Sequence, residues 1–283
     1  MSKRKLNNNN IIGTPYRTQI RRLGNPTFEI VREVSAPING YSDHVYTYDI
    51  RLTKEALRYF KNIIFTQSTA IQKELSGEVL MYENADILHV GHRGGVNMPA
   101  VKMSYHVHPG PAAMYGLQNT GTYISHPSIE DIHAYITTFP TCQVNFIIDI
   151  NGVFIIDLIK TLVDIKTGFL SKDRILHQIR ADTGKNLMNT NNTNALDEYK
   201  DYVKEVYNEV LLQKGPTVVM NGTYWYTNDI SNRLGQFAAR TGINIVYIPY
   251  STENTPPTFQ INTLSPLPIK KLQRSYNTPT NAL

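Results

Sequence analysis

The first half of the chain changes between strand-like and helix-like spacing of its apolar residues. Alternating β-branched and aromatic residues predict two strands joined by a Pro/Gly turn, over residues 27–37 and 44–52. Apolar residues at helical spacing then predict a helix over residues 53–75, with Thr53 as its N-cap and Gly77 just beyond its end. Three short strands are expected next, over residues 77–83, 86–92 and 99–108.

The remaining patterns combine helices with further strands. Residues 127–139 are typical of a helix, and residues 142–159 of a β-hairpin that turns at Asn151-Gly152, a dipeptide that supplies the positive φ angles of a tight turn. Amphipathic helices are predicted over residues 171–182 and 195–213. The strand–helix–strand pattern that follows, over residues 216–250, is typical of a mixed or parallel sheet.

These elements predict an α/β fold of the α+β type with a mixed sheet, and they divide the chain into four parts. A polar, basic and asparagine-rich stretch indicates a flexible arm, and a stretch rich in proline and threonine indicates an extended tail. The parts are the arm 1–27, a main domain 28–165, a helical and strand–helix–strand extension 166–250, and the tail 251–283.

Composition narrows the class of protein. Of 283 residues, 41% are hydrophobic and 18% charged, a globular balance. The single cysteine, Cys142, excludes an intramolecular disulfide and a cysteine-rich zinc site, and it favours a reducing compartment. No apolar run approaches the roughly 20 residues of a membrane helix, and the N-terminus lacks a signal-peptide core. We therefore expect a soluble, intracellular, cytoplasmic protein without a membrane partner.

The net charge of +5 comes from the arm. Residues 1–27 hold six Lys and Arg and no acid, so the rest of the chain carries −1. Such an arm could attract nucleic acid or an acidic protein surface, or it could be a solvated terminus. Because the arm lacks an interleaved pattern of aromatic residues for base stacking, nucleic acid is only weakly indicated.

His106 and His108 are the first candidates for chemistry. On a strand, alternate side chains share a face, so both imidazoles would point the same way and could bind one ion. An H-x-H pair alone is weak evidence, because two neighbouring turns would give the same letters.

The stretch from Ser128 to Asp131 allows two interpretations. A serine followed three residues later by an acid is a capping-box pattern, which accounts for both residues structurally. An aspartate in a first helical turn could equally offer a carboxylate oxygen as a third ligand. Two imidazoles, one carboxylate and a water form the open tetrahedral site typical of catalytic zinc.

A hydrolytic site also requires a base. Glu74 is expected at the end of the long helix, in an E-x-x-G arrangement with Gly77, where an acid is slightly unfavourable beside the helix dipole. Glu78 competes with Glu74 for this role, and the spacing to Gly77 favours Glu74. Among the other histidines, His126 could replace a ligand or gate the site, whereas His133 is expected to be a surface or packing residue.

Together and in this order, these pieces resemble the JAMM (JAB1/MPN/Mov34) metalloprotease family. The matching residues are Glu74 with Gly77, His106-Val107-His108-Pro109, and Ser128-Ile129-Glu130-Asp131. The resemblance covers roughly residues 45–160 and implies an MPN-like domain with cytidine-deaminase-like layering. The stretch between Pro109 and Ser128 is longer than the family's usual loop, so we expect it to fold out as an insertion beside the cleft.

The resemblance also implies roles and partners. His106, His108 and Asp131 would bind Zn²⁺, Glu74 would be the general acid/base, and Ser128 would stabilise the oxyanion. The implied reaction is hydrolysis of an amide or isopeptide bond in a protein or peptide substrate, including removal of a ubiquitin-like modifier. The alternative is a non-catalytic scaffold on an MPN-like fold, such as a component packaged in a large DNA virus particle. Residues 1–27 and 251–283 would then bind its assembly partners.

Overall fold

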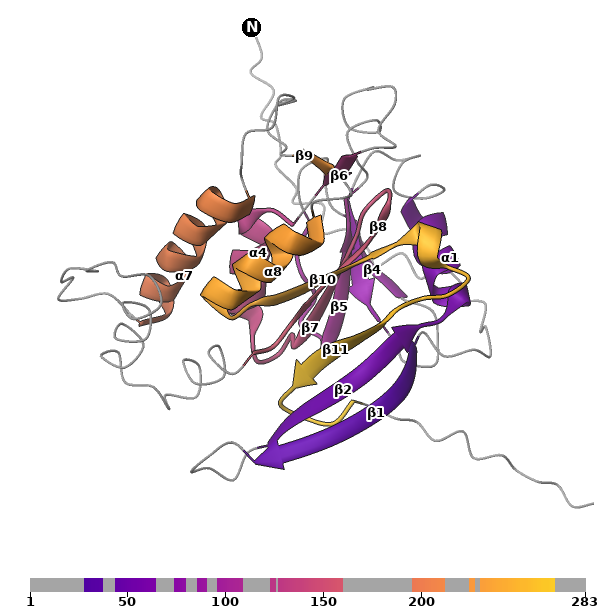
Figure 1. The fold of residues 1–283 in the computed structure, drawn as a ribbon, viewed down its shortest axis with the longest axis horizontal. Coiled ribbons are helices and arrows are strands. Elements are labelled where there is room, and N and C mark those ends of the chain that lie inside the picture. The colour runs from indigo at the N-terminus through magenta and orange to yellow at the C-terminus, as the bar shows by residue number, and fades with distance from the viewer. Residues whose placement is uncertain are drawn as a thin grey trace, which may run out of the picture.

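A computed structural model describes residues 28–37, 44–64, 74–79, 86–90, 96–108, 123–125, 127–159, 195–211, 224–226 and 230–267. Within these ranges the strands form sheets of six, three and two strands (Figure 1). Helices pack against the largest sheet, which contains parallel and antiparallel pairs. The predicted α+β class with a mixed sheet is therefore confirmed.

The six-stranded sheet carries the elements that matter for function. Its order is β10-β8-β7-β5-β3-β4, and β5 and β7 are its parallel pair while the other neighbours are antiparallel. Every residue of β5, β7 and β8 is buried, so these central strands are covered on both faces. The strands are β3 (Leu75–Glu78), β4 (Asp86–Val90), β5 (Met103–Val107), β7 (Val144–Ile148), β8 (Gly152–Asp157) and β10 (Asn244–Pro249).

The predicted β7–β8 hairpin is confirmed, but its glycine serves another purpose. The turn is closed by the Asp149 N–H, which donates to the Gly152 carbonyl at 2.9 Å. Gly152 is the first residue of β8, and a Cβ there would lie 2.5 Å from the Ile248 carbonyl oxygen and 2.7 Å from the Tyr247 ring. Close approach of β10 requires the glycine. A positive φ of 74° is found instead at Gly242, after the last helix.

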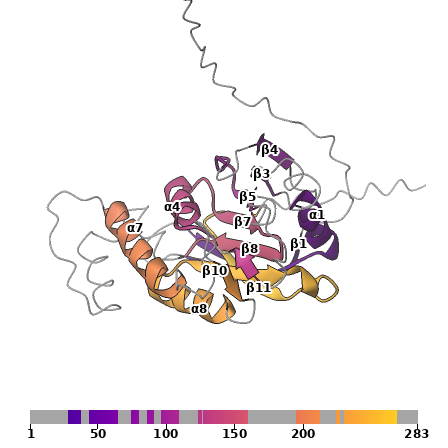
Figure 2. The same cartoon turned by 90° about the horizontal axis from the view of Figure 1, so that it is seen from above.

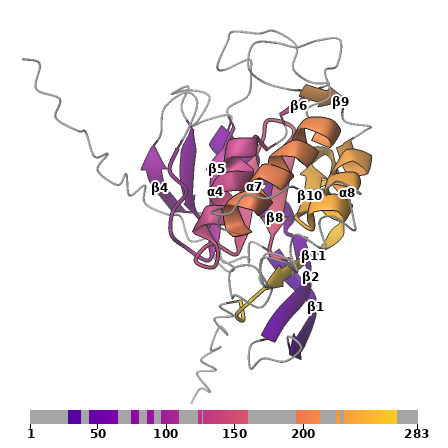
Figure 3. The same ribbon diagram turned by 90° about the vertical axis from the view of Figure 1, so that its left-hand side faces the viewer.

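Three helices cover one face of the large sheet, as Figure 3 shows. Their apolar sides form one continuous core with β7, β8 and β10, in which Phe154, Tyr199 and Phe237 are buried. The segment predicted as a separate extension thus shares this core with the main domain. The helices are α4 (Ile129–Thr138), α7 (Ala195–Val206), which continues as a π-helical turn (Tyr207–Leu211), and α8 (Ile230–Thr241).

The opposite face packs against α1 (Lys54–Asn62) and the three-stranded sheet, and α1 lies far from α7 when viewed from above (Figure 2). Thr53 caps α1 as predicted, since its hydroxyl accepts the Ala56 N–H at 3.1 Å. The three-stranded sheet has the order β1-β2-β11, and both pairs are antiparallel. Its strands are β1 (Phe28–Pro37), β2 (His44–Leu52) and β11 (Thr258–Thr263).

Two boundaries differ from the prediction. The helix predicted to reach residue 75 gives way by then to a strand, because β3 begins at Leu75. Residues 258–263, expected in an extended tail, form β11, whose Phe259 and Ile261 are buried beside β2. This part of the tail is therefore a sheet strand.

Several predictions lie outside the described residues: the arm 1–27, the helix 171–182, the strand 216–222 and the tail beyond residue 267. A short sheet, β6 (Tyr123–Ser125) with β9 (Tyr224–Tyr226), joins chain segments about a hundred residues apart. Within the described ranges, no helix has the length and apolar character needed to cross a membrane.

Candidate metal centre

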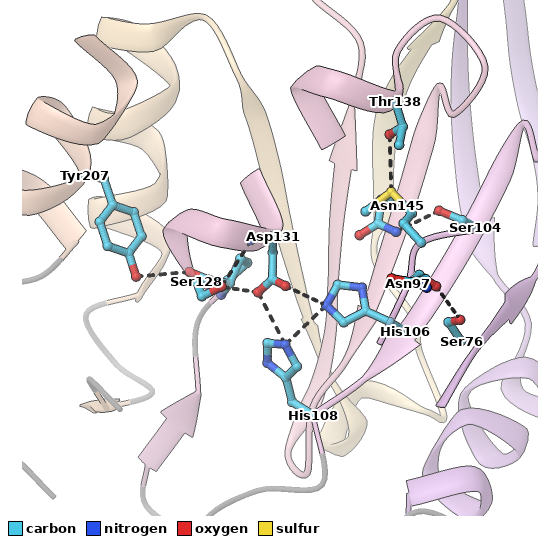
Figure 4. Close-up of polar contacts among 12 residues, drawn as sticks. Ser76, Asn97, Ser104, His106, His108, Ser128, Asp131, Thr138, Asn145 and Tyr207 are labelled. Atoms are coloured by element: carbon cyan, nitrogen blue, oxygen red, sulfur yellow. Dashed lines mark hydrogen bonds and ion pairs between the residues drawn. The ribbon is translucent and has the colours of Figure 1, made fainter. Parts of the chain in front are cut away.

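Strand β5 positions the two histidines. His106 is its fourth residue and His108 follows its end, so their side chains leave the same face of the sheet. The His108 N–H donates to the Ile148 carbonyl at 2.8 Å, which extends the ladder to β7 and holds the backbone there. The Nε2 atoms of the two imidazoles lie 3.2 Å apart. Figure 4 shows the two rings pointing toward each other and toward Asp131. The predicted shared face is confirmed.

The first turn of α4 brings Asp131 to the imidazole pair. Ser128 and Asp131 form a full capping box, in which the Ser128 hydroxyl accepts the Asp131 N–H at 3.1 Å and Asp131 Oδ2 accepts the Ser128 N–H at 2.7 Å. The same carboxylate lies 3.1 Å from His106 Nε2 through Oδ1 and 3.3 Å from His108 Nε2 through Oδ2. The capping interpretation is therefore confirmed, and the cap fixes the carboxylate toward the imidazoles, where an oxygen could also serve as a ligand.

The spacing of these side chains fits a single tetrahedral ion. Ligands bound at about 2.0–2.1 Å around a tetrahedral centre are separated from one another by about 3.3–3.4 Å. The contacts among His106, His108 and Asp131 are 3.1 to 3.3 Å, and one ligand atom from each lies within 4.8 Å of the others. This buried group could hold a metal ion.

The electrostatics of the group favour a cation. Burial alone would lower the pKa of His108, but the charge of Asp131 and its hydrogen bond, with the charges of Glu74 and Asp149, raise it to about 9. Burial alone would raise the pKa of Asp131, but the two imidazoles hold it well below its ordinary value. Positive charge is thus stabilised where the imidazoles meet the carboxylates, and a metal ion would take the place of a proton there.

Strand register places Glu74 beside His108. In the antiparallel pair β3–β5, Ser76 lies opposite His106 and Gly77 opposite Tyr105. Continuing this register by two residues sets Glu74 opposite His108 on the same face, where facing Cβ atoms are about 4.5–5.5 Å apart. Glu74 is 9% exposed, and its charge is one of those that raise the pKa of His108.

The same register separates the two candidate bases. Glu78 pairs with Ser104, two residues from His106 in the direction away from His108. At about 3.3 Å per residue, Glu78 is displaced along the strand by about 13 Å from Glu74. The preference for Glu74 agrees with this geometry, and Glu74, predicted at the end of a helix, directly precedes strand β3.

Asp149 belongs to the surroundings of the centre and was missed by the sequence interpretation. It directly follows β7, is fully buried, and lies at the same carboxyl edge as His108 because β5 and β7 are parallel. Carboxyl ends of parallel strands are frequent binding sites. The available signal was an acid immediately after the apolar run Phe146–Ile148.

Tyr207 was also missed. From the π-helical turn after α7, its hydroxyl donates to the Pro127 carbonyl at 3.3 Å, just before the α4 cap (Figure 4). A segment assigned to an extension therefore supports the loop that carries Ser128.

His133 has the predicted packing role, with Nε2 3.1 Å from the Lys200 carbonyl. His126 and residues 109–122, which make up most of the predicted insertion between Pro109 and Ser128, lie outside the described residues.

Comparisons of the chain with protein-family models, curated proteins and solved structures found no match. The described geometry alone establishes an α+β chain with a buried His-His-Asp group that could bind a metal ion. The identity of the metal and the reaction are matters of proposal.

Proposed function

We propose that this chain is a zinc-dependent hydrolase of the JAMM type that cleaves amide or isopeptide bonds. One observation carries the proposal: two imidazoles and a carboxylate converge at tetrahedral spacing, and the nearly buried Glu74 lies close enough for its charge to act on His108. Three protein ligands and a nearby acid are the donor set of catalytic zinc sites, whereas structural zinc sites use four protein ligands.

His106, His108 and Asp131 would hold the ion, and its coordination would be supported by the capping box and the β5–β7 ladder. A zinc ion held there supplies Lewis acidity, which polarises an amide carbonyl and makes water more acidic. Zinc binds well to a mixed set of nitrogen and oxygen ligands. Magnesium and calcium prefer ligand sets made only of oxygen atoms.

Glu74 would move the proton during hydrolysis. Its carboxylate accepts a proton from the attacking water as the C–O bond forms, and it returns that proton to the nitrogen as the C–N bond breaks. The low exposure of Glu74 supports this role, since it keeps bulk water away from the proton transfer.

Ser128 would stabilise the carbonyl oxygen. Its Oγ accepts the Asp131 N–H, which leaves the hydroxyl hydrogen available to donate to substrate. A donor aimed at developing negative charge is worth a factor of about 10²–10³ in rate. Capping and oxyanion stabilisation are compatible because a hydroxyl is both donor and acceptor.

The substrates we propose are proteins or peptides, including lysines joined to a ubiquitin-like modifier. The test uses zinc-loaded protein with lysine-linked modifier dimers and unmodified peptides, and it measures release of the cleaved amine. Glu74→Gln should abolish cleavage and retain zinc, while the matched Glu78→Gln should retain both. Equal cleavage by wild type and Glu74→Gln, or no hydrolysis of either substrate class, would contradict the proposal.

A further inference from the structure

Tyr207 connects the helical segment after residue 195 with the start of α4. It is the first residue of the π-helical turn that continues α7, and it is buried in the core that α7 shares with α4. Its hydroxyl donates to the Pro127 carbonyl at 3.3 Å. Turns of π-helix are rare and are frequently found at functional sites. The region that resembles the JAMM family ends near residue 160, so this contact reaches the site from outside that region.

The carbonyl that accepts this hydrogen bond and the Ser128 N–H belong to one peptide group. The group is planar, because the partial double bond between its carbon and nitrogen resists rotation. Its oxygen accepts the Tyr207 hydroxyl, and its N–H donates to Asp131 Oδ2 at 2.7 Å. The hydrogen bond from Tyr207 therefore fixes the orientation of the N–H that holds this carboxylate.

Asp131 links the same peptide group to the imidazoles. Its Oδ2 lies 3.3 Å from His108 Nε2, and its Oδ1 lies 3.1 Å from His106 Nε2. In Figure 4, dashed lines run from Tyr207 past Ser128 to Asp131 and on to both rings. Hydrogen bonds in such a chain polarise one another, so a donor to the carbonyl makes the N–H a stronger donor to the carboxylate.

The hydroxyl of Tyr207 keeps its proton and remains a donor. Burial raises the pKa of Tyr207 well above its ordinary value, and the charges of Asp131 and Glu130 raise it further. Both acids belong to the first turn of α4. Their effect agrees with the contact to Pro127, which places the hydroxyl beside this turn.

We propose that Tyr207 is a positioning residue of the metal centre, which acts through the peptide group between Pro127 and Ser128. This inference rests on the proposed function, which assigns metal binding to Asp131 and stabilisation of the oxyanion to Ser128. Tyr207 touches neither the metal nor the substrate. Its hydroxyl orients both side chains by holding the backbone that leads into the α4 cap.

Tyr207→Phe tests the inference, because it removes the hydroxyl and retains the ring in the core. Tyr202→Phe is the matched control. Tyr202 lies in α7, is 4% exposed like Tyr207, and donates its hydroxyl to the Arg240 carbonyl at 2.8 Å. Each variant loses one hydrogen bond from a tyrosine to a carbonyl, so both should fold and should lower the denaturation midpoint by similar amounts.

Zinc affinity separates the two variants and is measured by competition with a chromophoric chelator. Loss of a group that directly holds a metal ligand typically weakens metal binding by about 10–100-fold. Tyr207 acts through one further peptide group, so Tyr207→Phe should bind zinc about threefold to tenfold more weakly than wild type. Tyr202→Phe should bind zinc like wild type. Equal zinc affinities of the two variants, or no zinc binding by wild type, would overturn the inference.

Turnover at saturating zinc gives a second measurement. A displaced Ser128 hydroxyl weakens stabilisation of the transition state more than binding of the substrate, so Tyr207→Phe should lower kcat by at least about threefold and leave KM unchanged. An unchanged kcat, or an equal fall in Tyr202→Phe, would overturn the inference. No cleavage by any variant, with zinc affinity lowered only in Tyr207→Phe, would reject the hydrolase proposal and keep Tyr207 as a positioning residue of a zinc site.

Discussion

The buried carboxyl group of Asp157 predicts how the free energy of unfolding depends on pH. Asp157 ends β8, is fully buried, and its Oδ2 accepts the Asn262 backbone N–H at 2.7 Å and the Asn262 amide at 3.0 Å. Burial raises the pKa of Asp157 from 3.8 to about 8, although these hydrogen bonds act to lower it. The group therefore remains protonated in the folded protein at neutral pH.

The sign of the effect follows from proton linkage. Between pH 3.8 and about 8 the unfolded chain has lost this proton and the folded chain has kept it, so stability decreases as pH rises. Each pH unit in this window is worth about 1.4 kcal/mol. From about pH 5 to about pH 7.5, Asp157 should lower the free energy of unfolding by about 3 kcal/mol.

Asp157→Asn removes the titrating group and retains an oxygen that can accept the Asn262 N–H. Its gain in stability over wild type should be about 3 kcal/mol larger at about pH 7.5 than at about pH 5, measured by guanidinium denaturation followed by circular dichroism. Asp201→Asn, at an exposed position of α7, should show no such change. An equal gain for Asp157→Asn at both pH values would refute the reasoning.

Three further predictions test other parts of the structure. Ser128→Ala should cost about 1 kcal/mol of stability through loss of the α4 cap, seen in denaturation, and should also slow cleavage while zinc remains bound. Gly152→Ala should destabilise by about 1–3 kcal/mol, because its Cβ would lie 2.5 Å from the Ile248 carbonyl oxygen; an unchanged denaturation midpoint would contradict this. In steady-state assays Glu74→Gln should lower kcat by at least about a hundredfold and Glu78→Gln should not, and similar losses for both would argue against Glu74 as the base.

The features predicted well from sequence have local causes. Thr53 and Ser128 each cap a helix through a hydrogen bond to a residue three positions later, so the signal lies within one short stretch. The shared face of His106 and His108 follows in the same way from the alternation of a strand. The placement of the candidate ligands His106, His108 and Asp131 on their strand and helix could therefore be predicted without knowledge of tertiary structure.

The missed features depend on distant partners. Nothing near Asp157 predicts its burial, because its partner Asn262 is 105 residues away in β11. Strand β11 itself alternates buried Phe259 and Ile261 with exposed residues, but Pro256 and Pro257 and the surrounding threonines suggest an extended tail. Leu75 begins a strand buried within the sheet, where apolar spacing does not separate a strand from the end of a helix.

The zinc content of the purified 283-residue chain tests the central claim most directly. Elemental analysis after zinc saturation and removal of excess metal should give about one zinc per chain for wild type and none for His106→Ala, as expected for a site with three protein ligands. An Asn232→Trp variant, altered at an exposed position of α8 far from the ligands, should match wild type. Wild-type protein that binds no zinc at saturation, or His106→Ala protein that retains a full equivalent, would contradict the account.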